Sequence, residues 1–275
     1  MKIARRASPQ FLRRSVLIRR RLVPWLFLAI ALVTRAPEAQ AQAEFHKLNL
    51  MFSGNPSSFK AEDYKDFISE YNERVLVPHV LKEMDQISWG WRFEAELRYF
   101  ATPNFAISAG AGQLKTEKRQ EYLPRISQRI EVTTNIVSAP IHVGGSYYFS
   151  PYNQGNFRAR AYLGGGVMAH TNSKVFFEQL EFNTDSATTL GGSYRLKGRG
   201  EAPGYYAEFG AHMWFATRLS IILGVTYRSA DMTNLRYDTV AISPQGVETP
   251  FNPPFKPETL DLSGIGARFA VLFGL

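Results

Sequence analysis

The chain has 275 residues and no cysteine, with 45% hydrophobic and 13% aromatic residues. This composition is too apolar for a disordered chain and too polar for a bundle of transmembrane helices, and it excludes disulfides and thiol chemistry. Residues 1–43 hold nine of the 32 basic residues and one of the 24 acidic residues, which leaves 23 of each in residues 44–275. The net charge of +8 therefore belongs to the first segment, and nucleic-acid binding is not expected.

The first 43 residues have the three parts of a cleaved export signal. An arginine-rich start precedes an apolar run at 22–33, and small residues follow in the stretch Ala-Gln-Ala-Gln-Ala at 39–43. The apolar run has 12 residues, whereas a membrane-spanning helix needs about 20. We therefore expect a signal peptide that is cleaved after Ala41 or Ala43, rather than a retained membrane anchor.

The first expected strand, residues 46–53, is followed by a link with a helical pattern, residues 55–86. Apolar residues recur there at helical spacing, a serine is placed to cap the helix, and Pro78 is placed to end it. The apolar residues are Tyr64, Phe67, Ile68, Tyr71 and Val75, and the candidate caps are Ser57 and Ser58. The pattern predicts a short amphipathic helix, which either rests on the mouth of the fold or forms a receptor- or ligand-binding surface.

From residue 89 onward the sequence alternates with a period of two. In residues 89–99 every odd position, from Trp89 to Tyr99, is apolar, whereas the even positions are mostly charged. Such a strand has one face against hydrocarbon or a core and the other against water or ion-pair partners. Together with weaker repeats, the alternation predicts eight strands, at 46–53, 89–99, 105–114, 137–149, 157–167, 205–213, 219–227 and 264–273.

The expected links between these strands alternate in length. Short links fall at about 101–104, 150–156 and 216–218, and long links at about 55–86, 117–128, 174–202 and 230–258. An up-and-down meander with both ends on the short-turn side produces this alternation, and in bacterial outer-membrane barrels that side is periplasmic. Aromatic residues near the short links are expected to form a girdle at the inner interface: Tyr99, Phe100, Tyr147, Tyr148, Phe149, Trp214 and Phe215.

Several motifs carry a resemblance to a known family. They are Trp89-Gly90-Trp91-Arg92-Phe93, Leu97-Arg98-Tyr99-Phe100, Thr102-Pro103-Asn104-Phe105, Ala139-Pro140-Ile141, Tyr147-Tyr148-Phe149 and Ala161-Tyr162-Leu163-Gly164-Gly165-Gly166. With these motifs, nearly all of residues 44–275 resembles the small eight-stranded OmpA/OmpX/OmpW-like outer-membrane β-barrels. The closing segment, with Ile265, Phe269, Val271 and Phe273, is similar to the family's terminal strand, although Gly274 and Leu275 follow the last aromatic residue.

The resemblance implies an all-β fold: an eight-stranded antiparallel up-and-down transmembrane β-barrel over residues 44–275, with a short helix in the first long loop. It implies the outer membrane of a Gram-negative-type bacterium, reached by export through the inner membrane with signal cleavage. The implied partners are outer-membrane lipid and the outer-membrane insertion machinery, and the implied state is a monomer. Phe269, Val271 and Phe273 would then be a terminal-strand insertion signal.

The inward positions of such a barrel are rich in charge. The interior of an eight-stranded barrel is only wide enough for side chains to fill, and charges away from bulk water need partners. The sequence therefore predicts an internal ion-pair network, and the alternative is a narrow polar path biased toward anions by an excess of arginine. The inward charged residues are Arg92, Glu94, Glu96, Arg98, Arg158, Arg160, Glu208, Arg228 and Arg268.

The inward positions also hold the residue types of a membrane hydrolase or acyltransferase: His142, His170, His212, Ser138, Ser146 and Glu208. His142 lies about 13 Å along its strand from either serine, and the register to other strands is not known from sequence. The five histidines lack metal-ligand spacing. The glycine-rich stretches 110–112 and 164–166 fit close packing or strand bending rather than a phosphate loop. The sequence predicts no catalytic residue, no metal site and no cofactor.

Fold does not determine function, so the hypotheses rest on the site. The leading hypothesis is a non-enzymatic outer-membrane barrel with a structural or surface-interaction role, exerted through long extracellular loops whose partner is unknown. The alternative is a narrow conduit for small apolar or anionic solutes across the outer membrane. A soluble carrier of the lipocalin type would turn Trp89, Trp91 and Phe93 inward, and the aromatic clusters at the short links argue against it.

Overall fold

A computed structural model describes residues 46–77, 81–125, 128–149, 152–154, 157–183, 193–215, 218–253 and 256–275. All of them belong to the second of two compact units of the chain, Glu44–Leu275. The expected signal peptide and its cleavage sites lie outside the described residues, so its removal stays a prediction.

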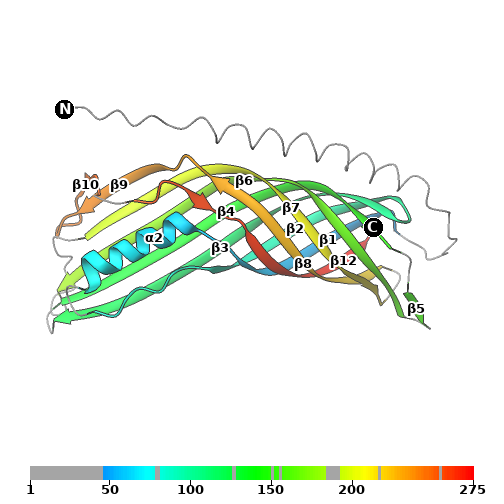
Figure 1. The fold of residues 1–275 in the computed structure, drawn as a ribbon, viewed down its shortest axis with the longest axis horizontal. Helices are drawn as coiled ribbons and strands as arrows, with labels where there is room; N and C mark the ends of the chain where they lie inside the picture. Colours follow the sequence, from blue (N-terminus) through cyan, green and yellow to red (C-terminus); the bar gives the residue numbers. More distant parts are fainter. Residues whose placement is uncertain are drawn as a thin grey trace, which may run out of the picture. The chain divides into compact units, whose positions relative to one another are not determined.

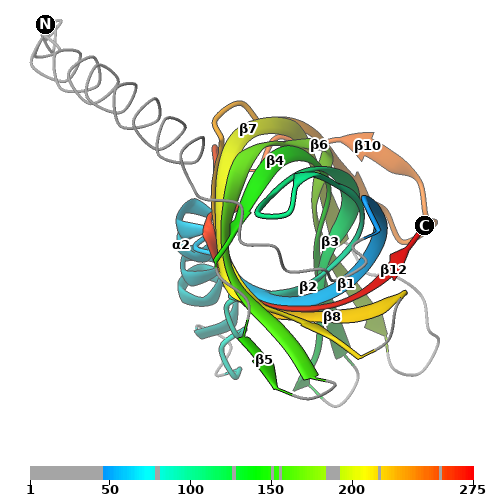
Figure 2. The same ribbon diagram turned by 90° about the vertical axis from the view of Figure 1, so that its right-hand side faces the viewer.

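Eight strands close a ring, which confirms the expected eight-stranded antiparallel barrel (Figure 1, Figure 2). Each strand pairs antiparallel with both neighbours, and the last strand closes on the first through pairs such as Leu50 with Phe273. In ring order, the strands are β1 (Leu48–Ser58), β2 (Trp89–Thr102), β3 (Phe105–Arg125), β4 (Gln128–Tyr148), β6 (Phe157–Asn183), β7 (Ser193–Trp214), β8 (Leu219–Met232) and β12 (Gly264–Gly274).

The outward face of the ring carries a continuous apolar belt. Its side chains are 39–67% exposed, a degree of apolar exposure that marks contact with lipid rather than with water. On β2 the belt runs from Trp89 to Tyr99, which matches the about 9–11 residues that a tilted transmembrane strand needs. The apolar belt consists of Phe52, Trp89, Trp91, Phe93, Leu97, Tyr99, Ile107, Ile141, Val143, Leu163, Val167, Tyr205, Phe209, Leu219, Leu223, Val225, Tyr227, Ile265, Phe269, Val271 and Phe273.

The belt places the ring across a membrane, so the chain is a transmembrane β-barrel. No helix in the described parts of the chain is long and apolar enough to cross a bilayer. Both ends of the described barrel lie on the short-turn side, as expected: Leu275 donates its backbone N–H to the Leu48 carbonyl over 3.0 Å, and the His46 ring lies 3.3 Å from the Leu275 carbonyl.

The expected inner girdle is only partly correct. Tyr99, Phe149 and Phe215 face outward and are 44–55% exposed, as an interfacial girdle requires. Phe100 and Tyr148 have the opposite parity and are buried in the lumen. Alternation along a strand sends adjacent aromatic residues to opposite faces, so a cluster in sequence divides between girdle and interior.

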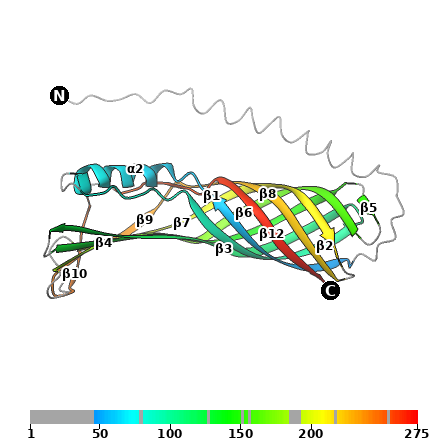
Figure 3. The same cartoon turned by 90° about the horizontal axis from the view of Figure 1, so that it is seen from below.

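Two of the expected long links are instead paired strands. β3 and β4 stay paired to Arg125 and Gln128, and β6 pairs with β7 as far as Gln179 and Tyr194. Beyond the barrel these strands continue into an extension sheet, formed by residues 115–125 of β3, 128–137 of β4, 173–183 of β6 and 193–200 of β7, together with β9 (Arg236–Ile242) and β10 (Glu248–Pro250) (Figure 3). Two further short strands, β5 (Tyr152–Gln154) and β11 (Leu260–Asp261), pair with β6 and β8.

The predicted helix is present as α2 (Glu62–Tyr71), continued by one π-helical turn, Asn72–Leu76. Its cap is Ala61, in the left-handed region at φ 43°, rather than Ser57 or Ser58, which belong to β1. The cap prediction was wrong because β1 extends five residues beyond its expected end, residue 53. Pro78 lies outside the described residues.

The apolar face of α2 is buried against the extension sheet (Figure 3). The ring of Phe177 on β6 lies 5.0 Å from that of Phe67 and 5.1 Å from that of Tyr71, both edge to face. The Tyr71 hydroxyl donates to Gln179 Oε1 over 2.7 Å. Burial raises the pKa of Tyr64 and Tyr71 above the usual tyrosine value, so both hydroxyls stay protonated. The helix therefore covers the sheet and presents no apolar face of its own.

Candidate functional site

The inward side chains of the barrel form three layers. At the short-turn end lies an inner plug of mostly apolar side chains: Met51, Phe100, Ala106, Tyr148, Tyr162, Ile222, Ala270 and Leu272. At the opposite end lies an outer cap, the apolar cluster that joins α2 to the barrel mouth and includes Phe59, Leu114, Ile136, Met232 and Leu262. Between the two layers lies a lumen network of charged side chains.

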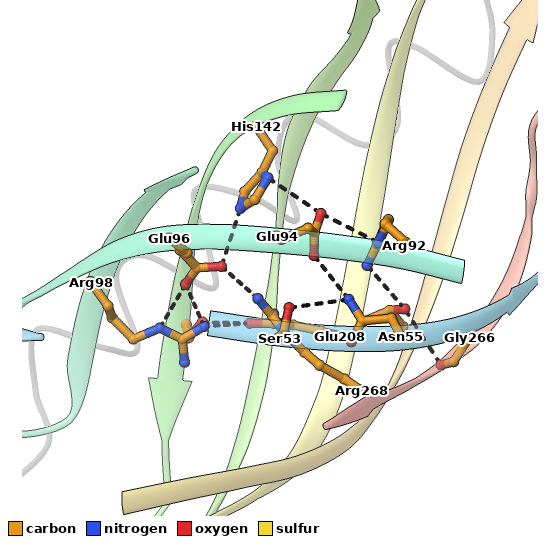
Figure 4. A network of polar contacts seen from close by, with 12 residues as sticks. Ser53, Asn55, Arg92, Glu94, Glu96, Arg98, His142, Glu208, Gly266 and Arg268 are labelled. Atoms are coloured by element: carbon orange, nitrogen blue, oxygen red, sulfur yellow. Dashed lines mark hydrogen bonds and ion pairs between the residues drawn. The ribbon is translucent and has the colours of Figure 1, made fainter. Parts of the chain in front are cut away.

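The centre of the lumen network consists of two arginines and two glutamates (Figure 4). Arg98 donates to Glu96 Oε1 over 2.7 Å and to Glu208 Oε1 over 3.3 Å, both through Nη2. Arg268 donates to Glu96 Oε2 over 2.6 Å and also to Glu208. All four side chains are at most 2% exposed. Each carboxylate therefore bridges both guanidinium groups, which is the paired arrangement that buried charges need.

Further polar residues complete the network. Arg92 lies 3.3 Å from Glu94, and Asn55 donates to Glu94 Oε2 over 3.0 Å. His142 Nε2 lies 3.1 Å from Glu96 Oε2, and Tyr148 accepts from Arg98 over 2.6 Å. The charged and titratable members of the lumen network are thus Arg92, Glu94, Glu96, Arg98, His142, Glu208 and Arg268 (Figure 4). The network meets the inner plug through the hydrogen bond from Arg98 to Tyr148.

The network crosses the full width of the lumen. Arg98 lies on β2 and Glu208 on β7, and three strands separate β2 from β7 in either direction around the ring. A direct ion pair between opposite walls therefore spans the lumen at this level. An eight-stranded barrel has room for little more than such side chains.

The lumen network is balanced in charge, because it contains three arginines and three glutamates. The other three arginines expected there lie elsewhere. Arg158 is exposed despite its inward parity, Arg160 donates to the Pro103 carbonyl over 2.5 Å, and Arg228 donates to the carbonyls of Leu262 and Ser58. Odd or even position in a strand predicts whether a side chain points inward or outward, but not its level along the barrel axis. Arg158 and Arg228 lie at opposite ends of the barrel.

Inward glycines make room for the network. A methyl group added at Gly164 would lie 2.6 Å from Ser146 Oγ and 2.7 Å from Glu208 Oε1, and one added at Gly110 would lie 2.7 Å from the His142 ring. The glycine-rich stretches 110–112 and 164–166 therefore permit close packing, as expected from sequence.

We expect Gly164→Ala to destabilise the barrel by about 1–3 kcal/mol, the usual cost of overpacking, because the new methyl group displaces Glu208 from its arginines. Gly54→Ala is the matched control, since its methyl group would meet only the Phe93 ring at 3.5 Å. Urea unfolding of both variants in the same lipid vesicles measures the difference. Equal stability of the two variants would contradict the crowding at Gly164.

Two serine–histidine contacts are present that the sequence did not reveal, and the first of them joins β4 to β6. Ser138 Oγ lies 2.8 Å from His170 Nδ1 and 2.7 Å from Ser173 Oγ. His170 Nε2 has no hydrogen-bond partner among the described residues, so the acid of a triad is missing there. All three residues are at most 1% exposed. The register between β4 and β6, which is interrupted by bulges, produces this contact.

The other two histidines have different partners. His142 belongs to the lumen network, and His212 Nε2 lies 2.7 Å from Ser220 Oγ with its ring stacked on Trp214 at 3.8 Å. No three His, Asp or Glu side chains of the described residues come together as a metal site. These contacts are those of buried polar residues in a packed lumen.

The proposed insertion-signal residues Phe269, Val271 and Phe273 all face outward on β12, the strand that closes the ring against β1. Phe273 makes an edge-to-face contact with Phe52 of β1, with ring centroids 6.5 Å apart. Recognition by insertion machinery stays a prediction.

Ring, belt and filled lumen together define the class: a small closed transmembrane β-barrel. No family model and no curated protein matches the sequence. Among solved structures, the chain is similar to Neisserial surface protein A (10% identity, TM-score 0.40, covering 83% of this chain and 97% of that one). It is also similar to OprG from Pseudomonas aeruginosa, with 11% identity and a TM-score of 0.39 over 84% of this chain and 98% of that one. The same holds for Ail from Yersinia pestis, with 9% identity and a TM-score of 0.37 over 83% of this chain and 100% of that one. At these values the likeness carries no argument about role, and the fold rests on the strand pairing above.

Proposed function

We propose that this protein is a non-enzymatic outer-membrane barrel whose closed lumen carries no solute, and that it has a structural or surface-interaction role outside the membrane. The observation that carries the proposal is the ion pair between opposite walls, Arg98 with Glu208. The outer cap and the inner plug close the lumen on either side of it.

The extension sheet supports a role outside the bilayer. Four strands of the ring continue past the apolar belt and stay paired beyond the register shifts at the barrel mouth, and α2 stiffens one face of the sheet by burying its apolar side chains there. The other face carries mainly charged residues, such as Arg119, Glu131 and Arg195. A stiff platform with a charged face fits contact with other surface molecules better than it fits a loop that opens and closes.

The conduit hypothesis loses its original motive. It rested on an excess of arginine in the lumen, and the network that fills the lumen contains equal numbers of arginines and glutamates. Arg160 and Arg228 bind backbone carbonyls at the ends of the barrel instead. Among the described residues, each arginine of the central layer lies beside a glutamate, which leaves anion selectivity no unpaired cation there on which to act.

We expect planar bilayers that contain the refolded barrel to show no sustained conductance. The comparison variant, Glu96→Ala/Glu208→Ala/Arg98→Ala/Arg268→Ala, empties the central layer but keeps the inner plug and the outer cap, so only brief transient currents are expected from it. Insertion of both proteins is verified by protease protection in the same bilayer lipid. Steady anion-selective currents from the unchanged protein would favour the conduit and overturn the proposal.

A further inference from the structure

A row of cations crosses the outward face of the extension sheet just beyond the apolar belt. Strand register places Lys115 of β3, Lys174 of β6, Arg199 of β7 and Arg236 of β9 side by side, with only Val137 of β4 among them. All four basic residues are exposed. We call these four residues the cationic row.

The cationic row is short of carboxylate partners. Lys115 pairs with Glu117 at 3.0 Å, whereas Lys174, Arg199 and Arg236 make no salt bridge with any residue that the structure describes. Lys174 lies directly opposite Arg199, which lies directly opposite Arg236. Like charges in directly opposed positions of a sheet destabilise it, so this arrangement is costly unless an anion lies against it.

The row begins at the edge of the membrane. Lys115 is in register with Trp91 of the belt. A groove of about 860 Å³ there is lined on one side by Pro56, Trp89, Trp91 and Phe93, and on the other by Lys115, Thr116 and Glu117. The Trp91 and Phe93 rings stack there, with centroids 6.1 Å apart. Tryptophan side chains prefer the level of the lipid headgroups, so the groove offers an apolar wall and a cation at the depth where acyl chain and headgroup meet.

From this edge the row climbs through the headgroup layer. On β2, the belt extends two residues beyond the level of the row toward the outer end of the barrel, to Trp89. On β7, the row itself lies six residues beyond Tyr205, the last belt residue of that strand in the same direction. With strands about 4.8 Å apart and tilted about 40°, the row rises about 3 Å per strand. The long aliphatic parts of lysine and arginine side chains also let their charged groups extend back toward the membrane interface. We propose that the cationic row, with the groove at its lower end, binds the phosphate groups of an anionic membrane lipid.

The test measures lipid binding to the full-length barrel, refolded in detergent micelles, by native mass spectrometry. The probes are phosphatidic acid and phosphatidylcholine with the same acyl chains, and inorganic phosphate and a soluble polyphosphate serve as free anions. We expect phosphatidic acid to remain bound and phosphatidylcholine to be lost. Binding should weaken as salt is raised, because the charges are exposed.

Lys174→Gln/Arg199→Gln should weaken phosphatidic acid binding about 25-fold, because each cation near an anionic surface strengthens binding about fivefold. The matched control, Lys82→Gln/Lys256→Gln, removes the same charge from exposed residues outside the row and should leave binding unchanged. The charge-preserving exchange Lys174→Arg/Arg199→Lys should also retain binding. Gel mobility with and without heating shows that each variant is folded.

Three results would overturn the proposal. Equal loss in the row variant and the control would show a general charge effect, and no loss in either would show that the row is not a lipid site. Polyphosphate binding as tight as that of phosphatidic acid would assign the row to a soluble polyanion instead. The lipid-binding assay does not measure conductance. A negative result would therefore contradict the lipid-binding proposal without bearing on the closed-lumen proposal.

Discussion

Glu208→Gln will destabilise the barrel by about 3–5 kcal/mol, the cost of breaking a buried ion pair. Glu208 is the carboxylate that Arg98 reaches from the opposite wall of the lumen and that Arg268 reaches from β12, and it also accepts from Ser146 over 3.0 Å. A neutral amide leaves the two guanidinium groups with one carboxylate, Glu96, between them. Urea unfolding in vesicles and the temperature at which the folded band disappears on gels both measure the loss.

The control for this result is Glu70→Gln on α2. Glu70 pairs with Arg74 at 2.6 Å, but the two side chains are 37% and 61% exposed, and such surface pairs are worth about 0–1 kcal/mol. The double variant Glu208→Gln/Arg268→Gln should lose less stability than the two single variants added together, because it restores the balance of charge. Similar losses from Glu208→Gln and Glu70→Gln would mean that the lumen network does not hold the barrel together.

Leu223→Arg will hinder insertion by about 2–4 kcal/mol, the cost of a cation on the lipid face near the bilayer midplane. Leu223 is the middle residue of the belt on β8, which runs from Leu219 to Tyr227, and its side chain is 42% exposed. The measurement is the free energy of folding into vesicles from urea.

Leu219→Arg makes the same substitution at the inner edge of the same strand. There the arginine reaches headgroups and water, and the expected cost is only about 0–1 kcal/mol. The two variants differ in depth alone, so equal penalties would show that the apolar belt is not the membrane-spanning surface.

The ring and the belt were predictable from sequence because both depend on local alternation. A residue such as Phe93 or Phe269 faces lipid by virtue of its parity within its own strand, and no knowledge of other strands is needed. The extension sheet was not predicted because its outward face carries Lys115, Glu117 and Arg119, so the contrast between the two faces of β3 is weak beyond the belt.

The lumen contacts were less predictable, since they depend on register around the ring and on depth along it. The contact between Ser138 and His170 follows from the pairing of β4 with β6, including an offset at bulges that no local pattern reveals. The inward charged residues were predicted from parity alone, yet Arg158 is exposed and Arg228 donates to backbone carbonyls. Sequence parity therefore identified candidates for the network but could not identify partners.

The position of the lumen network in the chain bears on how the barrel assembles. Glu96 and Arg98 belong to the second strand of the ring, Glu208 to the sixth and Arg268 to the last. Until β12 reaches β1, Glu96 and Glu208 each lack one of their two arginines, and an incomplete sheet holds uncompensated charge on the face that will become the interior. Ring closure and neutralisation of the interior therefore occur in one step. Partly closed intermediates gain little stability, and folding into the membrane should be strongly cooperative.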